Sequence, residues 1–294
     1  LSSLLSEGNG QYYPPSPPAY CTNDINTRDI PPLTESQAAQ VSSLIQVQNV
    51  IRHGARTLAN APFCWMNYDI SWNDCNVTDM MLTSESYSSQ NIPANWMFRK
   101  LYDGSPNDLG GNCQTGQLIS QGYDMEVGLG QVLQRAYFGP SSNPNLKLFP
   151  SNSWESINAS RIYLRSDDTT RVLQSAQLVM ESLFNRTTSE NSNPGEIFEI
   201  IPIHTGDLDL DQLNPNAKVC PRLNDVLAAS GESPEFEAHI SSPAFYQTTG
   251  DLAALWGPFG SFWNWENAGD CVWTTSKAMC CVVLCGCVSY LVCS

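Results

Sequence analysis

The sequence has little positive charge, and this shortage excludes two broad classes of partner. Its 294 residues contain 14 Lys and Arg against 29 Asp and Glu, which gives a formal net charge of −15. So acidic a chain is repelled by nucleic acid and by anionic membrane surfaces, so we expect neither as a main partner. A small anionic ligand is still compatible with this charge, because a local group of arginines can hold it.

Histidine is scarce as well, with three residues in the chain. The cysteines outside the C-terminal tail are dispersed and form no Cys-x2-Cys pair: Cys21, Cys64, Cys75, Cys113, Cys220 and Cys271. We therefore expect no zinc site, and the sequence indicates no metal or other cofactor. Dispersed cysteines together with glycosylation sequons at Asn76, Asn158 and Asn185 indicate disulfides in an oxidising compartment. A secreted or a lysosomal or vacuolar glycoprotein is expected.

No signal peptide is visible at the start of the sequence. Residues 1–5 lack an initiator methionine, a basic region and a long apolar run, so we expect a fragment or a mature product. Residues 1–33 contain a patch rich in Pro, Tyr and Ser, and a short helix is expected over 34–43. Together they predict an N-terminal extension at 1–43. Residues 58–116 have no clear period and predict a long loop region held by disulfides.

The sequence does contain an apolar segment followed by a basic turn. Residues 44–51 are rich in Leu, Ile and Val, which is typical of a strand buried on both faces of a parallel sheet. The turn Arg-His-Gly-Ala-Arg follows at 52–56, at the sheet edge where such folds place their ligands. Arginines match phosphate oxygens and lower the pKa of a nearby histidine, so His53 is expected to stay neutral and nucleophilic. Taken alone, the same turn would also fit a solvated surface loop.

A second strand and helix extend the pattern. Residues 162–164 predict a strand, and a helix capped by Asp167 or Asp168 is expected to follow it. Its apolar residues recur every three or four positions, and they are Val172, Leu173, Ala176, Val179, Met180, Leu183 and Phe184. Arg171 lies in the first turn of this helix. If the two strands are parallel, Arg171 joins Arg52 and Arg56 around His53.

These elements predict an α/β fold. A helix from about Ser120, its expected cap, to Tyr137 precedes the second strand, and residues 197–203 predict a third. Alternating strands and helices favour a three-layer αβα arrangement with a mostly parallel central sheet. Residues 206–270, with mixed helical patterns, predict a smaller α-helical cap.

The sequence resembles the histidine acid phosphatases of the phosphoglycerate-mutase-like fold. Four segments in order carry the resemblance: the Arg-His-Gly-Ala-Arg turn at 52–56, Gln-Leu-Ile-Ser-Gln-Gly at 117–122, Arg-Ser-Asp-Asp-Thr-Thr-Arg at 165–171, and the stretch from 201–205 through 211–213 to 220–222. The resemblance implies that His53 accepts phosphate and that Arg52, Arg56 and Arg171 bind it. It implies hydrolysis of phosphate monoesters at acid pH through a phosphohistidine, without metal.

In this family, a proline is usual two residues after the second arginine of the 52–56 motif. Leu58 stands there, so a slightly different loop path is expected.

The other two histidines receive no catalytic role. His204 follows an apolar strand, where the family places a structural histidine, so we expect it to be partly buried and hydrogen-bonded. His239 lies in the cap region without a partner pattern and is expected at the surface.

The family's acid–base pair is missing from the sequence. The family supplies its proton donor from a His-Asp pair near the C-terminus, and this chain contains no His-Asp dipeptide. Residues 276–294 instead form a cysteine-rich apolar tail. A transmembrane anchor would need about 17–25 apolar residues, and 278–293 falls just short. The cysteine spacing also fits a metal site poorly. We favour translation of an unspliced or shifted reading frame, which would remove the last strand or strands of the fold.

The predicted organisation is therefore an extension at 1–43, an incomplete phosphatase core at 44–205, a cap at 206–275 and an aberrant tail at 276–294. The predicted function is hydrolysis of small phosphomonoesters, impaired here by the missing proton donor. Three alternatives stay open: an inositol-phosphate (phytate-type) phosphatase, which the scarcity of basic residues disfavours, a non-catalytic module that binds phosphate esters, and a membrane-tethered glycoprotein. Membrane contact is expected only through the tail, and the sequence does not indicate an oligomeric state.

Overall fold

The computed structural model describes residues 34–40, 43–59, 64–65, 67–68, 70–75, 109–138, 147–148, 159–184, 201–213, 215–257 and 264–275. Several predictions fall outside these residues and stay predictions. They concern the first 33 residues with Cys21, the three sequons, the beginning of the third strand and the C-terminal tail.

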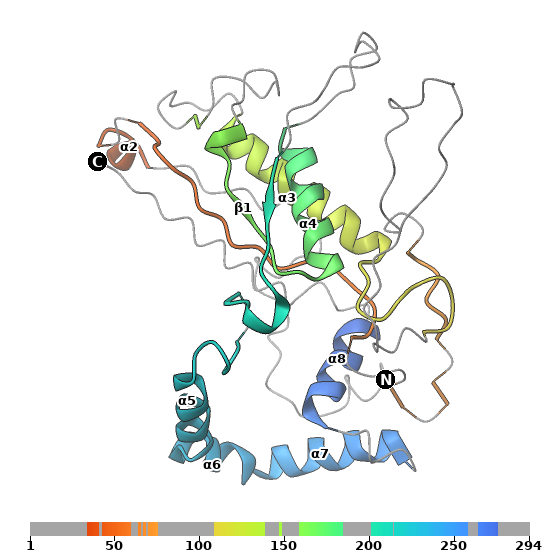
Figure 1. Ribbon diagram of the computed structural model, residues 1–294. Coiled ribbons are helices and arrows are strands. Elements are labelled where there is room, and N and C mark those ends of the chain that lie inside the picture. Colours follow the sequence, from red (N-terminus) through yellow and green to blue (C-terminus); the bar gives the residue numbers. More distant parts are fainter. Residues whose placement is uncertain are drawn as a thin grey trace.

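Two long helices pack against each other beside a pair of strands (Figure 1). Helix α3 spans Ser120–Tyr137 and helix α4 spans Thr170–Leu183, which confirms both predicted helices. Leu129 and Leu133 of α3 meet Val179 of α4 in a small core. Val179 belongs to the apolar stripe that the sequence predicted for α4, so that stripe includes part of the face that α4 packs on α3.

The predicted caps of these helices are wrong. The N-cap of α3 is Ile119, and the Ser120 hydroxyl instead donates to the carbonyl of Asp74 at 2.9 Å. The N-cap of α4 is Thr169, whose side chain makes no capping bond. Asp167 Oδ1 accepts from the Thr169 amide at 2.9 Å, so this carboxylate holds the turn before the helix.

The strands that the structure describes are short and parallel. Strand β1 covers Leu164–Arg165 and strand β2 covers Ile203–His204, with Leu164 opposite Ile203 and Arg165 opposite His204. Because α4 lies between the two strands in sequence, the unit is a strand, a crossover helix and a parallel strand. The α/β class predicted from the sequence is confirmed.

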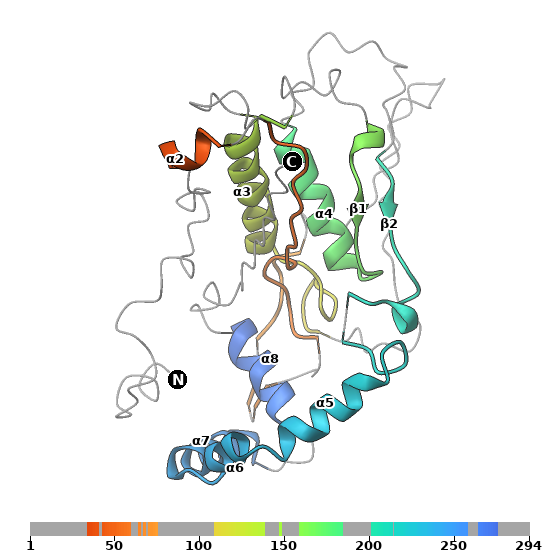
Figure 2. The ribbon, with the colours of Figure 1, turned by 90° about the vertical axis from the view of Figure 1, so that its left-hand side faces the viewer.

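The predicted strand at 44–51 is not a strand. This segment runs extended beside α3 and α4 (Figure 2), and it joins no sheet within the described residues. Ile45 is 51% exposed and Val50 67% exposed, while Ile51 packs on the core of α3 and α4. A strand needs a neighbouring strand to pair its backbone. The described part of β1 pairs with β2 instead, and helices offer side-chain contacts only.

Helices dominate the rest of the described chain. Helix α2 covers Glu35–Ala38, and then come α5 (Arg222–Gly231), α6 (Pro234–Ile240), α7 (Pro243–Trp256) and α8 (Trp265–Thr275). Ser233 and Ser242 cap α6 and α7, each followed by proline at the first helical position. The helical prediction for 206–270 is confirmed. No helix in the described residues is long and apolar enough to cross a membrane.

A second core joins α7 and α8 to the segments before and after residues 76–108, which lie outside the described part of the chain. It contains Leu58, Cys64, Trp72, Cys75, Leu109, Cys113, Ile119, Trp256, Ala268 and Cys271. Disulfides join Cys64 to Cys271 and Cys75 to Cys113. The prediction that disulfides hold the loop region is confirmed, and the first of them also fastens α8 to that region. Cys220 is a free, exposed thiol.

Candidate active site

The basic turn at 52–56 lies between the N-terminal halves of α3 and α4. The Gly54 amide donates to Ser175 Oγ of α4 at 3.3 Å. On the other side, a Cβ at Gly54 would lie 2.4 Å from the carbonyl oxygen of Gly122, and a Cβ at Gly122 would lie 2.1 Å from that of Ala55. A side chain at either glycine would clash with the backbone of the other segment, so both positions require glycine. The turn is thus packed closely against both helices.

A short antiparallel pairing fixes the chain just after His53. The Ile119 amide donates to the Ala55 carbonyl at 3.0 Å, and the Thr57 amide donates to the Gln117 carbonyl at 2.9 Å. The side chain of Thr57 is fully buried, and its hydroxyl accepts from the Gln117 amide at 3.0 Å. The two sequence segments that resemble the phosphatase motifs are therefore neighbours through backbone contacts.

The imidazole of His53 has one nitrogen engaged and one available. Its Nδ1 lies 2.8 Å from the carbonyl oxygen of Gly54. A carbonyl only accepts hydrogen bonds, so Nδ1 carries the proton and Nε2 keeps its lone pair. The lone pair that a nucleophile needs is thus on Nε2.

Burial and neighbouring charge both keep His53 neutral. The pKa of its imidazole is lowered from 6.5 to about 3, first by burial, and then by the positive charges of Arg171, Arg56 and Arg52. The bond to Gly54 acts in the opposite direction. The structure therefore brings all four predicted site residues into electrostatic contact, and the prediction of a neutral histidine among arginines agrees with this environment.

The three arginines reach His53 from two segments. Arg171 comes from the first turn of α4, and its Nη1 lies 3.1 Å from where a Cβ of Gly116 would sit. Arg52 is exposed, yet the surrounding protein and the charge of Arg56 lower the pKa of its guanidinium, while Asp270 raises it. Arg56 is half-buried. Cations on two elements flank one imidazole, as a phosphate site requires.

Sequence reasoning missed Asp270 of α8. Its Oδ1 accepts from Arg56 Nη1 at 2.8 Å, and its Oδ2 accepts from the Ala59 amide at 2.7 Å. The two residues are 214 positions apart, so no local pattern could connect them. The neighbouring Cys271 was the available signal, because its disulfide to Cys64 carries α8 to this place.

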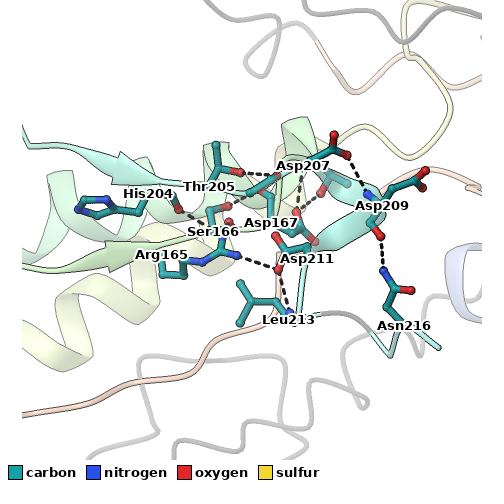
Figure 3. A network of polar contacts seen from close by, with 12 residues as sticks. Arg165, Ser166, Asp167, His204, Thr205, Asp207, Asp209, Asp211, Leu213 and Asn216 are labelled. Carbon is teal, nitrogen blue, oxygen red and sulfur yellow. Dashed lines mark hydrogen bonds and ion pairs between the residues drawn. The ribbon is translucent and has the colours of Figure 1, made fainter. Parts of the chain in front are cut away.

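The first arginine of the 165–171 segment supports the fold and not the phosphate site. Arg165 Nη2 donates to Asp211 Oδ1 at 2.9 Å, and the same oxygen accepts from the Leu213 amide at 2.8 Å (Figure 3). The Asp211 carboxylate is fully buried. This network ties the end of β1 to the chain that leads into α5.

His204 does not have the predicted environment. Its side chain is exposed, and its ring stacks on that of Tyr163 with centroids 4.6 Å apart. Figure 3 shows the ring directed away from the polar network, which only the His204 carbonyl joins. The reason is the alternation of β2, whose last residue faces outward. His239 is exposed, as predicted.

A metal would need several suitable ligands in one place. Within the residues that the structure describes, no group of three or more His, Cys, Asp or Glu side chains is arranged to hold a metal ion. The positive groups around His53 would instead hold an anion.

Comparison with known proteins shows the family to which this chain belongs. Residues 43–247 match the family model described as the histidine phosphatase superfamily (branch 2). Counting factor 60 of Dictyostelium discoideum is 31% identical over 265 residues, which cover 88% of this chain and 57% of that protein. Human prostatic acid phosphatase is 29% identical over 157 residues, which cover 53% of this chain and 37% of that protein. Human lysosomal acid phosphatase is 28% identical over 130 residues, 44% of this chain and 28% of that protein.

The chain belongs to the histidine phosphatase superfamily, branch 2. It spans a little over half the length of the Dictyostelium protein and smaller shares of the two human ones. The likeness to acid phosphatases supports the family that the four sequence segments had indicated.

Proposed function

We propose that His53 is the phosphate-accepting nucleophile of an acid-phosphatase-type site, and that Arg52, Arg56 and Arg171 bind the phosphate. The observation that carries this proposal is the state of His53. Its Nδ1 proton is held by Gly54, its pKa is lowered to about 3, and arginines provide the surrounding charge. The substrate class is a small phosphate monoester, because one imidazole among guanidiniums matches one phosphoryl group.

The chemistry follows from the free lone pair. Nε2 of His53 attacks phosphorus, the bond from phosphorus to the ester oxygen breaks, and a phosphohistidine forms. The arginines neutralise the charge that spreads over the phosphoryl oxygens. Water then attacks the phosphohistidine, which releases inorganic phosphate and restores His53.

Two proton transfers limit the rate in this chain. The leaving alkoxide needs a proton, and the attacking water must lose one. These 294 residues contain no His-Asp dipeptide, which is the pair that the family resemblance implies for this step. We therefore propose that this chain hydrolyses ordinary alkyl phosphates slowly, even though its nucleophile and its arginines are in place.

An acidic, oxidising compartment suits these features. The two disulfides form under oxidising conditions, and human lysosomal acid phosphatase is among the similar proteins. His53 stays neutral in mild acid because its pKa lies near 3. We propose a secreted, lysosomal or vacuolar location, with residues 44–205 as the phosphatase core and 206–275 as its cap.

A second candidate function is capture of phosphate esters without turnover. The absence of a His-Asp dipeptide favours it, because binding needs only the arginines. Both candidates predict phosphate binding, and they differ in whether His53 becomes covalently modified.

Titration with inorganic phosphate tests what both candidates share. We expect the purified chain to bind phosphate at pH 5 in calorimetry, with a rise in melting temperature. Arg171→Gln should weaken this binding on the order of tenfold, because a charged hydrogen-bond donor is lost. Arg222→Gln is the matched control, since Arg222 is exposed on α5. An unchanged melting temperature with no heat of binding would reject the phosphate site.

A further inference from the structure

Among the described residues, the hydrogen bonds of the Arg56 side chain all come from one of its nitrogens. Nη1 donates to Asp270 Oδ1 and to the Thr57 carbonyl, each at 2.8 Å, so both of its protons are used. Nε is buried and has no hydrogen-bond partner among the described residues. The hydrogen bonds that fix the guanidinium among the described residues are therefore those of Nη1.

Asp270 is itself firmly placed. Its side chain is 3% exposed, against 15% for that of Arg56. Its second oxygen accepts from the Ala59 amide at 2.7 Å, and the next residue, Cys271, is bonded to Cys64. A carboxylate fixed by a backbone amide and a disulfide can fix a flexible arginine in turn.

The geometry of the guanidinium decides what this contact leaves available. Nε and Nη2 form one side of the planar group, and their N–H bonds point the same way, so together they match two phosphate oxygens. Nη1 lies at the opposite corner. A partner on Nη1 therefore leaves the Nε and Nη2 side available for an anion.

We propose that Asp270 is a positioning residue that directs the Nε and Nη2 side of Arg56 toward a phosphate at His53. This inference rests on the proposed phosphate site. Asp270 lies on α8, beyond residues 43–247, the range that matches the family model. Helix α8 thereby contributes to anion binding without touching the anion.

The direction in which Asp270→Asn changes phosphate affinity distinguishes a positioning role from a purely electrostatic one. A negative charge close to the site repels phosphate, so its removal alone would strengthen phosphate binding. Loss of positioning has the opposite effect, because Arg56 regains freedom that binding must then remove. Asp270→Asn keeps the size of the side chain, removes the charge and leaves one acceptor for two donors.

The experiment compares phosphate affinity at pH 5 by calorimetry for the wild-type chain, Asp270→Asn and Asp209→Asn. Asp209 supplies the matched control, because it pairs with Lys218 and is 75% exposed. We expect Asp270→Asn to bind phosphate about tenfold more weakly, and Asp209→Asn to stay within about twofold. Equal or tighter binding by Asp270→Asn would overturn the inference while leaving the proposed function standing. A wild-type chain that binds no phosphate would reject the proposed function, and with it this role.

A measurement on the wild-type chain covers the case in which Asp270→Asn fails to fold. The Nε–H signal of Arg56 is followed by ¹⁵N-edited NMR and assigned with Arg56→Lys. Positioning predicts that this signal shifts as phosphate is added. A signal that stays in place while phosphate binds would overturn the inference.

Discussion

His53 combines a fixed tautomer with a lowered pKa, and both come from its immediate surroundings. The Gly54 carbonyl orients the ring, and burial with three nearby arginines disfavours its charged form. An ordinary histidine would be protonated in mild acid and could not attack phosphorus. This one keeps its lone pair under the conditions in which acid phosphatases are expected to work.

The neutral state of His53 is directly measurable. At pH 5 we expect ¹⁵N NMR to show its imidazole protonated at Nδ1 only, because the pKa of about 3 lies below this pH. His53→Gln assigns the signal. Protonation of both nitrogens already near pH 6 would contradict the described environment.

The arginines should affect this titration unequally. Arg171 lowers the pKa of His53 more than Arg52 does. Arg171→Gln is therefore expected to raise that pKa more than Arg52→Gln, and the same NMR titration compares the two variants. The reverse order would place Arg171 farther from the imidazole than the structure has it.

The sequence identified the site residues that lie within short motifs. It missed the residues that tertiary contacts bring to these motifs. His53, Arg52 and Arg56 stand in the segment 52–56, and Arg171 stands in the segment 165–171. The sequence predicted that these two segments would lie together. Asp270 and Ser175 take part only because α8 and α4 pack beside the turn. Their positions depend on tertiary contacts that no spacing in the sequence encodes.

At the scale of elements, the helices were predictable and the first strand was not. The apolar spacing from Val172 to Phe184 predicted helix α4, and α3 lies where the sequence from Ser120 to Tyr137 predicted it. The apolar run at 44–51 predicted a buried strand, yet Ile45 and Val50 are exposed. The segment is extended, as a strand would be, and it runs beside α3 and α4. It forms no backbone pairing with another strand among the described residues.

The close packing of α3 on α4 gives a prediction at this scale. A Cβ at Gly130 of α3 would lie 1.9 Å from Ser182 Oγ and 2.5 Å from the Val179 carbonyl oxygen of α4. Gly130→Ala must push the helices apart, which should lower the free energy of unfolding by about 1–3 kcal/mol in urea denaturation.

Gly250 of α7 provides the matched control. A Cβ there would meet nothing within 4 Å, so Gly250→Ala should raise the free energy of unfolding by about 0.5–1 kcal/mol. If Gly130→Ala proved as stable as wild type, the described contact between the helices would be wrong.

The whole molecule is held together by covalent links as well as by its cores. The disulfide between Cys64 and Cys271 joins residues 207 positions apart, and the one between Cys75 and Cys113 joins residues 38 apart. Dispersed cysteines predicted disulfides correctly, while their pairing could not be read from one sequence. The long link brings α8, and so Asp270, to the basic turn.

The two disulfides should therefore differ in their effect on phosphate binding. Replacing either pair by alanine should lower the free energy of unfolding by about 2–5 kcal/mol. Only the Cys64→Ala and Cys271→Ala double variant should also weaken phosphate binding several-fold, because it frees α8. Calorimetry on both double variants, under conditions where each is folded, makes the comparison. Equal phosphate affinities would show that the long link does not serve the site.

The most direct test of the whole account is the covalent modification of His53. The chain is mixed at pH 5 with p-nitrophenyl phosphate, whose leaving group departs without a proton donor. We predict a rapid release of about one nitrophenolate per chain, phosphate on His53 by mass spectrometry, and then slow turnover. His53→Gln should show no such release. If no phosphate appears on His53, or if His53→Gln releases nitrophenolate as the wild-type chain does, His53 is not the nucleophile.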